Sequence, residues 1–94
     1  MSNKIILKDI AEIREQLQNN CMLKSTDTFE ENAVKFINNE LNKIAIQIAH
    51  NVFSHDENRN LVITRIVEEI NPQVIPVEIG RRLIAIERFY HNLQ

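Results

Sequence analysis

The longest run of regularly spaced apolar residues extends from Thr28 to Ser54 and contains neither proline nor glycine. Its apolar positions recur every three or four residues, the spacing that places side chains on one face of a helix. The stripe consists of Val34, Ile37, Leu41, Ile44, Ile48 and Val52. Thr28 and Glu31 have the spacing of a capping box, which predicts that the helix begins there. We therefore expect one long helix over residues 28–54.

Three shorter amphipathic segments flank this helix. Residues 4–19 place four apolar side chains at three- and four-residue steps, and residues 77–93 repeat that rhythm after Pro76. Residues 62–71 begin with branched side chains that suit a strand or a helix, and the segment ends before Pro72 because a proline disfavours the helical conformation of the preceding residue. The chain is expected to form a single all-α domain over residues 1–94. Its four helices, at about 4–19, 28–54, 62–71 and 77–93, would pack around the long one.

The apolar stripe on the long helix is wider than two neighbouring helices would cover. A helix over residues 28–54 would also be about 40 Å long, whereas a compact chain of this size has a diameter of roughly 32 Å. Both features predict a homodimer that buries the surplus apolar surface. Its expected interface combines the stripe defined above with residues of the last helix, namely Ile79, Leu83, Ile86 and Tyr90.

Gly80 is the only glycine in the chain. Phosphate-binding glycine loops, dinucleotide fingerprints and nucleophile elbows all need more than one, so these enzyme motifs are excluded. A glycine within a helical pattern costs about 1 kcal/mol relative to alanine and often marks a close approach between backbones. We expect another helix to cross the last helix at Gly80. The sequence indicates a protein that is not an enzyme.

The formal net charge of −2 argues against general binding to phosphate backbones. The functional interpretation of the arginines is a patch that binds an anion or a nucleic acid, with Arg59, Arg81, Arg82 and Arg88 as its members. The alternative is that Glu78 pairs with Arg82 one helical turn away and the other arginines are solvated. The single Cys21 and the absence of an apolar run of about 20 residues favour a cytoplasmic protein that neither enters a membrane nor is exported.

No residue pattern predicts a metal or a cofactor. His50, His55 and His91 contain no pair at the four-residue spacing of a helical metal site. Residues 56–60 alternate like the first ligands of a calcium loop, but Leu61 stands where that loop requires glycine. Cys21 is interpreted as a half-buried loop thiol rather than a nucleophile.

The order of helix, loop, long helix, loop and short helix over residues 4–70 resembles the layout of histone-fold proteins. Arg59 would correspond to the loop arginine of that fold, whereas Ile66 stands where its aspartate partner would be expected. The resemblance implies helix-mediated dimerisation.

These observations favour a small regulatory or adaptor protein that acts as a dimer through helix-mediated contacts with another protein. Two alternatives stay open. One is a helical, histone-fold-like dimer that binds nucleic acid through its arginines, and the other is an inhibitor or immunity-type protein that blocks an enzyme. The sequence names neither the partner nor the pathway, and it leaves open whether the last helix is exchanged between two chains.

Overall fold

The computed structural model describes residues 3–21, 27–52 and 61–93, and these contain four α-helices. The helices are α1 (Asn3–Gln16), α2 (Thr28–His50), α3 (Val62–Glu69) and α4 (Val77–Leu93). A π-helical turn, Leu17–Cys21, continues α1. None of the described residues forms a strand, so the all-α prediction is confirmed.

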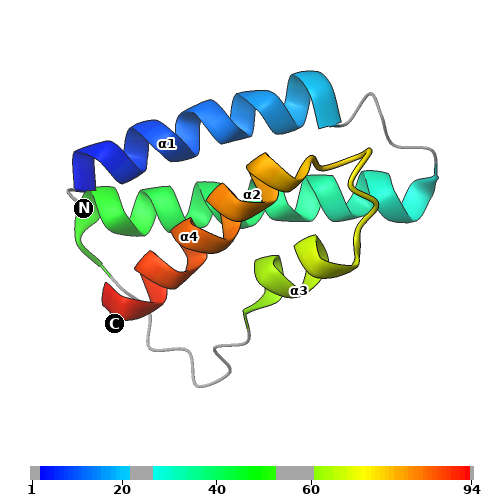
Figure 1. Cartoon of the computed structure of the whole chain (residues 1–94). Coiled ribbons are helices and arrows are strands. Elements are labelled where there is room, and N and C mark those ends of the chain that lie inside the picture. The colour runs from blue at the N-terminus through cyan, green and yellow to red at the C-terminus, as the bar shows by residue number, and fades with distance from the viewer. Residues whose placement is uncertain (1–2, 22–26, 53–60, 94) are drawn as a thin grey trace.

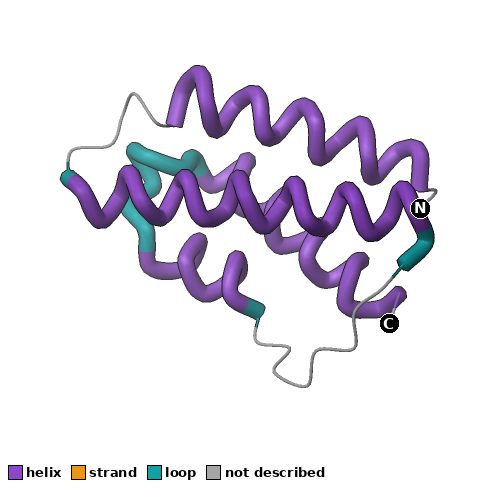
Figure 2. Tube along the Cα trace, turned by 180° about the vertical axis from the view of Figure 1, so that it is seen from behind, coloured by secondary structure: helices purple, strands orange, loops and turns teal. Residues whose placement is uncertain are grey.

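The helices are arranged in two layers. Helices α1 and α2 lie side by side and antiparallel, and α4 crosses one face of this pair with α3 beside it (Figures 1 and 2). The molecule measures 37 × 27 × 18 Å, and its shortest dimension matches two layers of helices packed at an interaxial distance of about 10 Å. Arg14 helps to join α1 to α2, because its guanidinium donates hydrogen bonds of 2.9 Å to Asn38 and to Asn42.

The hydrophobic core lies between the two layers and receives side chains from every helix. Most of these side chains are branched aliphatic residues, which hold few rotamers and pack densely. The buried residues are Ile6, Ile10, Ile13, Leu17, Cys21, Ala33, Val34, Ile37, Leu41, Ile44, Ile48, Ile63, Ile70, Val74, Ile75, Leu83 and Ile86. The periodic apolar positions of residues 4–19, 28–54 and 77–93 therefore largely identify the core.

Helix α2 begins at Thr28, as the sequence predicts, but its N-cap residue is not the one that the capping-box pattern indicates. Asp27 is the N-cap residue, with extended backbone angles, and its carboxylate accepts a 2.7 Å hydrogen bond from the backbone N–H of Glu30. Thr28 is instead the first residue within the helix. Aspartate is as favourable as serine at this position, so Asp27 takes the role that the sequence pattern assigns to Thr28.

Helix α2 ends at His50, four residues before the predicted end at residue 54. Asn51 adopts the left-handed conformation with φ of 53°, and the backbone N–H of Val52 donates a 3.0 Å hydrogen bond to the carbonyl of Gln47. This closure is a common way to end a helix, and asparagine adopts it at low cost. Because apolar residues recur as far as Val52, the sequence pattern does not reveal that the helix ends at His50.

The shorter α2 weakens the case for a dimer built on this helix. At 23 residues the helix is about 35 Å long, which fits within the 37 Å length of the molecule. The width of the stripe no longer calls for a second copy either, because Val34, Ile37, Leu41, Ile44 and Ile48 are at most 6% exposed in a single chain. Helix α1 in the same layer, together with α3 and α4 in the opposing layer, covers the stripe that the sequence alone assigns to a second copy. These residues form the internal core and offer no surface for an interface.

The remaining predicted interface residues have mixed positions. Leu83 and Ile86 are buried in the core, whereas Ile79 and Tyr90 are half-buried. The Tyr90 hydroxyl donates a hydrogen bond to the side chain of Gln47, which ties the end of α4 to α2. Val52, the last residue of the predicted stripe, is 64% exposed and faces solvent.

Helix α3 is two residues shorter than the predicted helix at 62–71, and a turn follows it. The helix ends at Glu69, and its most buried residue is Ile63, whereas Val62 lies at the surface. Residues 72–74 form a turn. The side chain of Asn71 accepts a 2.9 Å hydrogen bond from the backbone N–H of Gln73, a local closure typical of asparagine before proline. The turn sends Val74 and Ile75 into the core.

Candidate protein interaction site

A buried carboxylate joins α4 to the start of α3. Glu87 of α4 is 5% exposed, and its two oxygens accept hydrogen bonds of 2.9 Å from the backbone N–H groups of Ile63 and Thr64. The Thr64 hydroxyl donates a third, 2.7 Å hydrogen bond to Glu87 Oε1. The first backbone N–H groups of a helix have no partner within the helix, and they attract negative charge. Glu87 therefore caps α3 from a different helix.

The sequence explains why α3 depends on this external cap. Its N-cap residue is Leu61, whose side chain has no oxygen and makes no capping hydrogen bond. A helix as short as α3 is marginal in isolation, so its geometry depends on packing and capping. Because α4 caps α3 through Glu87 and also packs against it, the two helices form one structural unit.

A close contact fixes the other end of this unit. Gly80 of α4 is buried against α3, and a Cβ atom built at Gly80 would lie only 2.8 Å from Cγ1 of Val67. Real Cβ atoms essentially never approach another atom so closely. The expected crossing at Gly80 is therefore observed, and its partner is α3.

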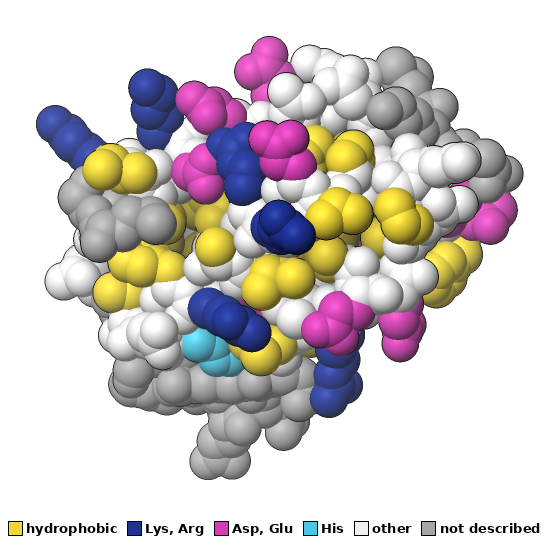
Figure 3. All heavy atoms as spheres, in the orientation of Figure 1, with side chains coloured by type: hydrophobic (Ala, Val, Ile, Leu, Met, Phe, Trp, Pro, Cys, Tyr) yellow, Lys and Arg dark blue, Asp and Glu magenta, His cyan; other side chains and the backbone are white. Residues whose placement is uncertain are grey.

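An apolar groove opens where α3, α4 and the turn between them meet. Its volume is about 150 Å³, and nearly all of its lining side chains are aliphatic or proline. The lining residues are Val67, Ile70, Pro72, Ile75, Pro76, Val77, Gly80, Arg81 and Ile84. Apolar side chains gather on the face that α3 and α4 present, and both basic and acidic side chains surround them (Figure 3). Among the described residues that line the groove, Arg81 alone is charged.

The outer edge of this groove is a stripe on α4 that alternates apolar and basic residues. Val77, Arg81, Ile84 and Arg88 follow one another at intervals of four, three and four residues, so they lie along one face of the helix. Val77 is 58% exposed, and Arg81 and Arg88 are also exposed. Within residues 3–21, 27–52 and 61–93, neither arginine forms an ion pair. Both guanidiniums are available to a ligand.

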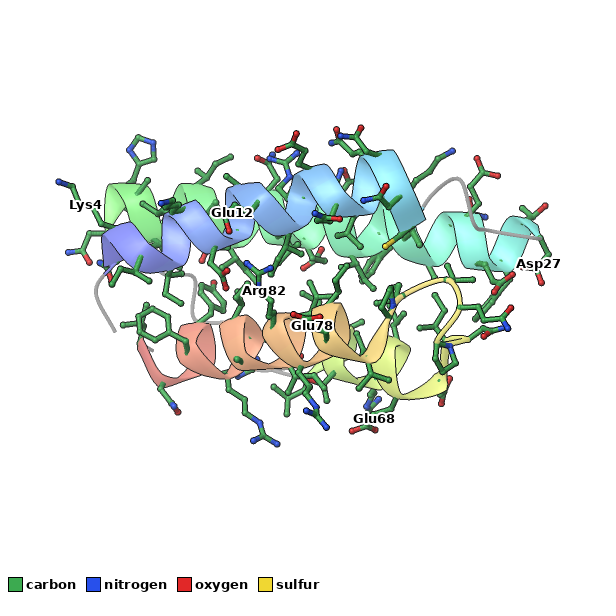
Figure 4. All side chains as sticks on the ribbon, turned by 45° about the horizontal axis from the view of Figure 1, so that its top comes forward. Lys4, Glu12, Asp27, Glu68, Glu78 and Arg82 are labelled. Carbon is green, nitrogen blue, oxygen red and sulfur yellow. The ribbon has the colours of Figure 1, made fainter. Side chains whose placement is uncertain are left out.

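Arg82 has a different role from its neighbour Arg81. It reaches across to α1, where its guanidinium donates hydrogen bonds to Asp9 and, at 3.2 Å, to Glu12 (Figure 4). These contacts raise the pKa of the Arg82 guanidinium above its ordinary value, chiefly through the hydrogen bond to Asp9. The expected partner, Glu78, lies on the same helix, but Arg82 instead links the two layers. It is therefore engaged within the fold.

Replacing Arg82 with methionine is expected to lower the free energy of unfolding by only about 0.5 kcal/mol, because partly exposed ion pairs are weak. Urea denaturation at low and at high salt measures this effect, and the difference from wild type should shrink as salt rises. A loss that is large and independent of salt would show that packing of the aliphatic stem dominates instead.

The other candidate residues do not assemble into a site. Arg59 and His55 lie outside the described residues, as does most of the segment considered for calcium. His50 is exposed at the end of α2, and His91 lies near the end of α4 beside Tyr90. The described histidines, acids and cysteine form no cluster that could hold a metal ion.

Cys21 is 1% exposed at the end of the π-helical turn, so it is a core residue rather than the half-buried loop thiol expected from the sequence. Within the described part of the chain, no helix has the length and apolarity needed to cross a membrane.

Sequence reasoning did not identify Glu87 or Val67 as important residues. A signal for Glu87 exists, because it falls beside Leu83, Ile86 and Tyr90 on the apolar face of α4, where an acid needs a buried partner. That partner is the start of α3, which only the three-dimensional arrangement brings near. Val67 offers no comparable signal.

Comparison of the chain with protein-family models, with curated proteins and with solved structures found no match. The histone-fold likeness therefore rests on the order and lengths of the helices alone.

Proposed function

We propose that this chain is a small regulatory or adaptor protein without enzymatic activity, which acts through helix-mediated contacts with other protein molecules. The observation that carries the proposal is the apolar groove between α3 and α4, with Arg81 in its lining. A concave apolar surface with one well-placed polar group is the usual form of a binding site. Grooves between helices are also common docking sites for a helix of another protein.

The contacts that hold the walls of the groove together support this proposal. Glu87 holds the start of α3 against α4, and Gly80 permits close packing of the two helices at Val67. A site whose walls are fixed before binding loses less conformational entropy when the partner arrives. A turn that buries Val74 and Ile75 anchors the segment that completes the groove.

Matched charge substitutions test whether the groove is the contact surface. Val77, at the groove, and Ile46, on the outer face of α2, are 58% and 52% exposed, so glutamate at either position should leave the fold intact. Tagged wild-type, Val77→Glu and Ile46→Glu proteins would be used to capture partners from the native cells. We expect wild type and Ile46→Glu to capture the same partner, and Val77→Glu to capture at least about tenfold less of it. The new carboxylate would be buried in an apolar contact and would compete with the partner for Arg81, which lies one helical turn away. Equal capture by all three proteins would contradict the proposal.

We also propose that the chain forms a homodimer, whose interface lies on exposed residues rather than along the α2 stripe. Because the α2 stripe is internal, a second copy would have to use exposed residues such as those at the groove. Light scattering at micromolar concentration should then give twice the chain mass of 11.0 kDa, and the thermal midpoint should rise with protein concentration. A mass of one chain with a constant midpoint would reject the dimer but leave contact with another protein open.

Nucleic-acid binding is the weaker alternative. Of the four arginines proposed for it, Arg82 is paired with α1, and Arg81 and Arg88 are the exposed members within the described residues. Binding through phosphate contacts would weaken steeply between about 50 and 200 mM salt. Docking in an apolar groove would change little over that range.

A cytoplasmic location is also a proposal, and it is based on the single cysteine of the chain.

A further inference from the structure

We propose that the groove between α3 and α4 binds an amphipathic helix of a partner protein that carries acidic residues beside its apolar anchors. This inference rests on the proposed function and specifies the chemistry of the partner. It is drawn from the charge pattern of the stripe Val77, Arg81, Ile84 and Arg88, together with the apolar lining of the groove.

The spacing of the stripe suits a helix lying along α4. Arg81 and Arg88 are seven residues apart, which corresponds to about 10.5 Å along the helix axis. Two carboxylates seven residues apart on a partner helix would match them. Guanidinium and carboxylate groups can form paired hydrogen bonds, so each such contact also sets the orientation of the partner. Ile84 lies between the two arginines and would pack against the apolar side of the partner.

The volume of the groove suits an apolar anchor. Cavities of about 150 Å³ in protein interiors admit a benzene-sized group, so this groove has room for one leucine or phenylalanine side chain. An anchor that fills such a pocket, with charged contacts at its rim, is the usual arrangement at protein interfaces. A phosphate backbone would satisfy the arginines but would leave the aliphatic lining exposed to water. An acidic amphipathic helix satisfies both parts of the surface.

The proposal can be tested with two designed helical peptides. One has a leucine anchor and glutamates seven residues apart, and the other has lysines in place of the glutamates. Fluorescence anisotropy would measure binding of each peptide to the wild-type protein and to two charge variants. The first variant, Arg81→Glu with Arg88→Glu, changes the stripe. The second, Lys4→Glu with Lys8→Glu, makes the same change in net charge at two exposed positions of α1.

We expect the wild type to bind the glutamate peptide at least about tenfold more tightly than the lysine peptide. The stripe variant should reverse this preference, whereas the α1 variant should retain it. Equal affinity of the two peptides for the wild type would overturn the proposal. Equal losses in the two variants would also overturn it, because general attraction between opposite charges would then explain the binding. Thermal denaturation of each variant verifies that the fold is intact.

The peptide experiment and the Val77→Glu capture experiment together distinguish failure of this inference from failure of the proposed function. If the wild type shows no preference between the peptides but Val77→Glu still loses its natural partner, the groove is an interaction site and the acidic helix is the wrong occupant. If Val77→Glu retains its partner, the groove itself is not the site. Binding of a second copy would appear in the light-scattering measurement as a doubled mass that Val77→Glu abolishes.

Discussion

Replacing Glu87 with alanine is expected to lower the free energy of unfolding by about 3 kcal/mol. The substitution removes the acceptor of the backbone N–H groups of Ile63 and Thr64 and of the Thr64 hydroxyl, and all three donors are in a buried region. Loss of a cap typically costs about 1 kcal/mol, and each buried donor left without a partner adds to that cost. Urea denaturation followed by circular dichroism measures the change.

Glu87→Gln provides the matched control. The glutamine keeps one acceptor oxygen and nearly the same shape but lacks the charge, so about 1 kcal/mol should be lost. Amide hydrogen exchange should show α3 opening before the rest of the protein in the alanine variant. If Glu87→Ala and Glu87→Gln were both as stable as wild type, the capping role assigned to Glu87 would be wrong.

Gly80→Ala is expected to destabilise the protein by about 1 kcal/mol, although alanine is the better helix former. Alanine gains about 1 kcal/mol from helix propensity, while overpacking against Val67 costs up to about 3 kcal/mol. Val67 cannot readily move aside, because a β-branched side chain in a helix has one strongly preferred rotamer. Thermal and urea denaturation would determine the sign of the change.

The same substitution should have the opposite sign when Val67 is alanine. Val67→Ala removes Cγ1, the atom that would lie 2.8 Å from the new methyl group. In that background Gly80→Ala should be neutral or stabilising, and the double-mutant cycle should show a coupling of at least about 1 kcal/mol. Additive effects of the two substitutions would indicate that the two helices do not touch at these residues.

Hydrophobic periodicity predicts the fold class and most of the core. Ile6, Ile37 and Leu83 are buried because their helices are amphipathic, and the period of about 3.6 residues can be read without knowing the neighbouring helices. The expected bounds of α4, residues 77–93, agree with the structure. Pro76 and the regular apolar spacing define that helix locally.

The ends of the helices and the oligomeric state are harder to predict from the sequence. Asn51 ends α2 through a left-handed conformation, but the apolar Val52 and Phe53 after it continue the pattern. The resulting overestimate of the length of α2 led to the expectation of a buried dimer interface. The width of the α2 stripe has a simpler cause, since α1 in the same layer and α3 and α4 in the opposing layer share it within one chain.

The candidate site depends almost entirely on tertiary structure. The sequence indicates that Gly80 marks a crossing and that Arg81, Arg82 and Arg88 are basic, but not which of them is free. Arg82 meets Asp9 and Glu12, which lie 73 and 70 residues earlier in the chain, so no local pattern reveals these pairs. The groove likewise needs α3, the turn and α4 together.

Site-specific photo-cross-linking tests the central claim, that the groove is where the chain contacts other proteins. A photo-reactive benzoylphenylalanine would be placed at Val77 in one protein and at Ile46 in another, and both would be irradiated in the native cells. We expect a discrete covalent adduct from position 77 and none from position 46, and the mass of the adduct distinguishes a second copy from a different partner. An adduct from position 46 alone, or equal adducts from both positions, would contradict the claim.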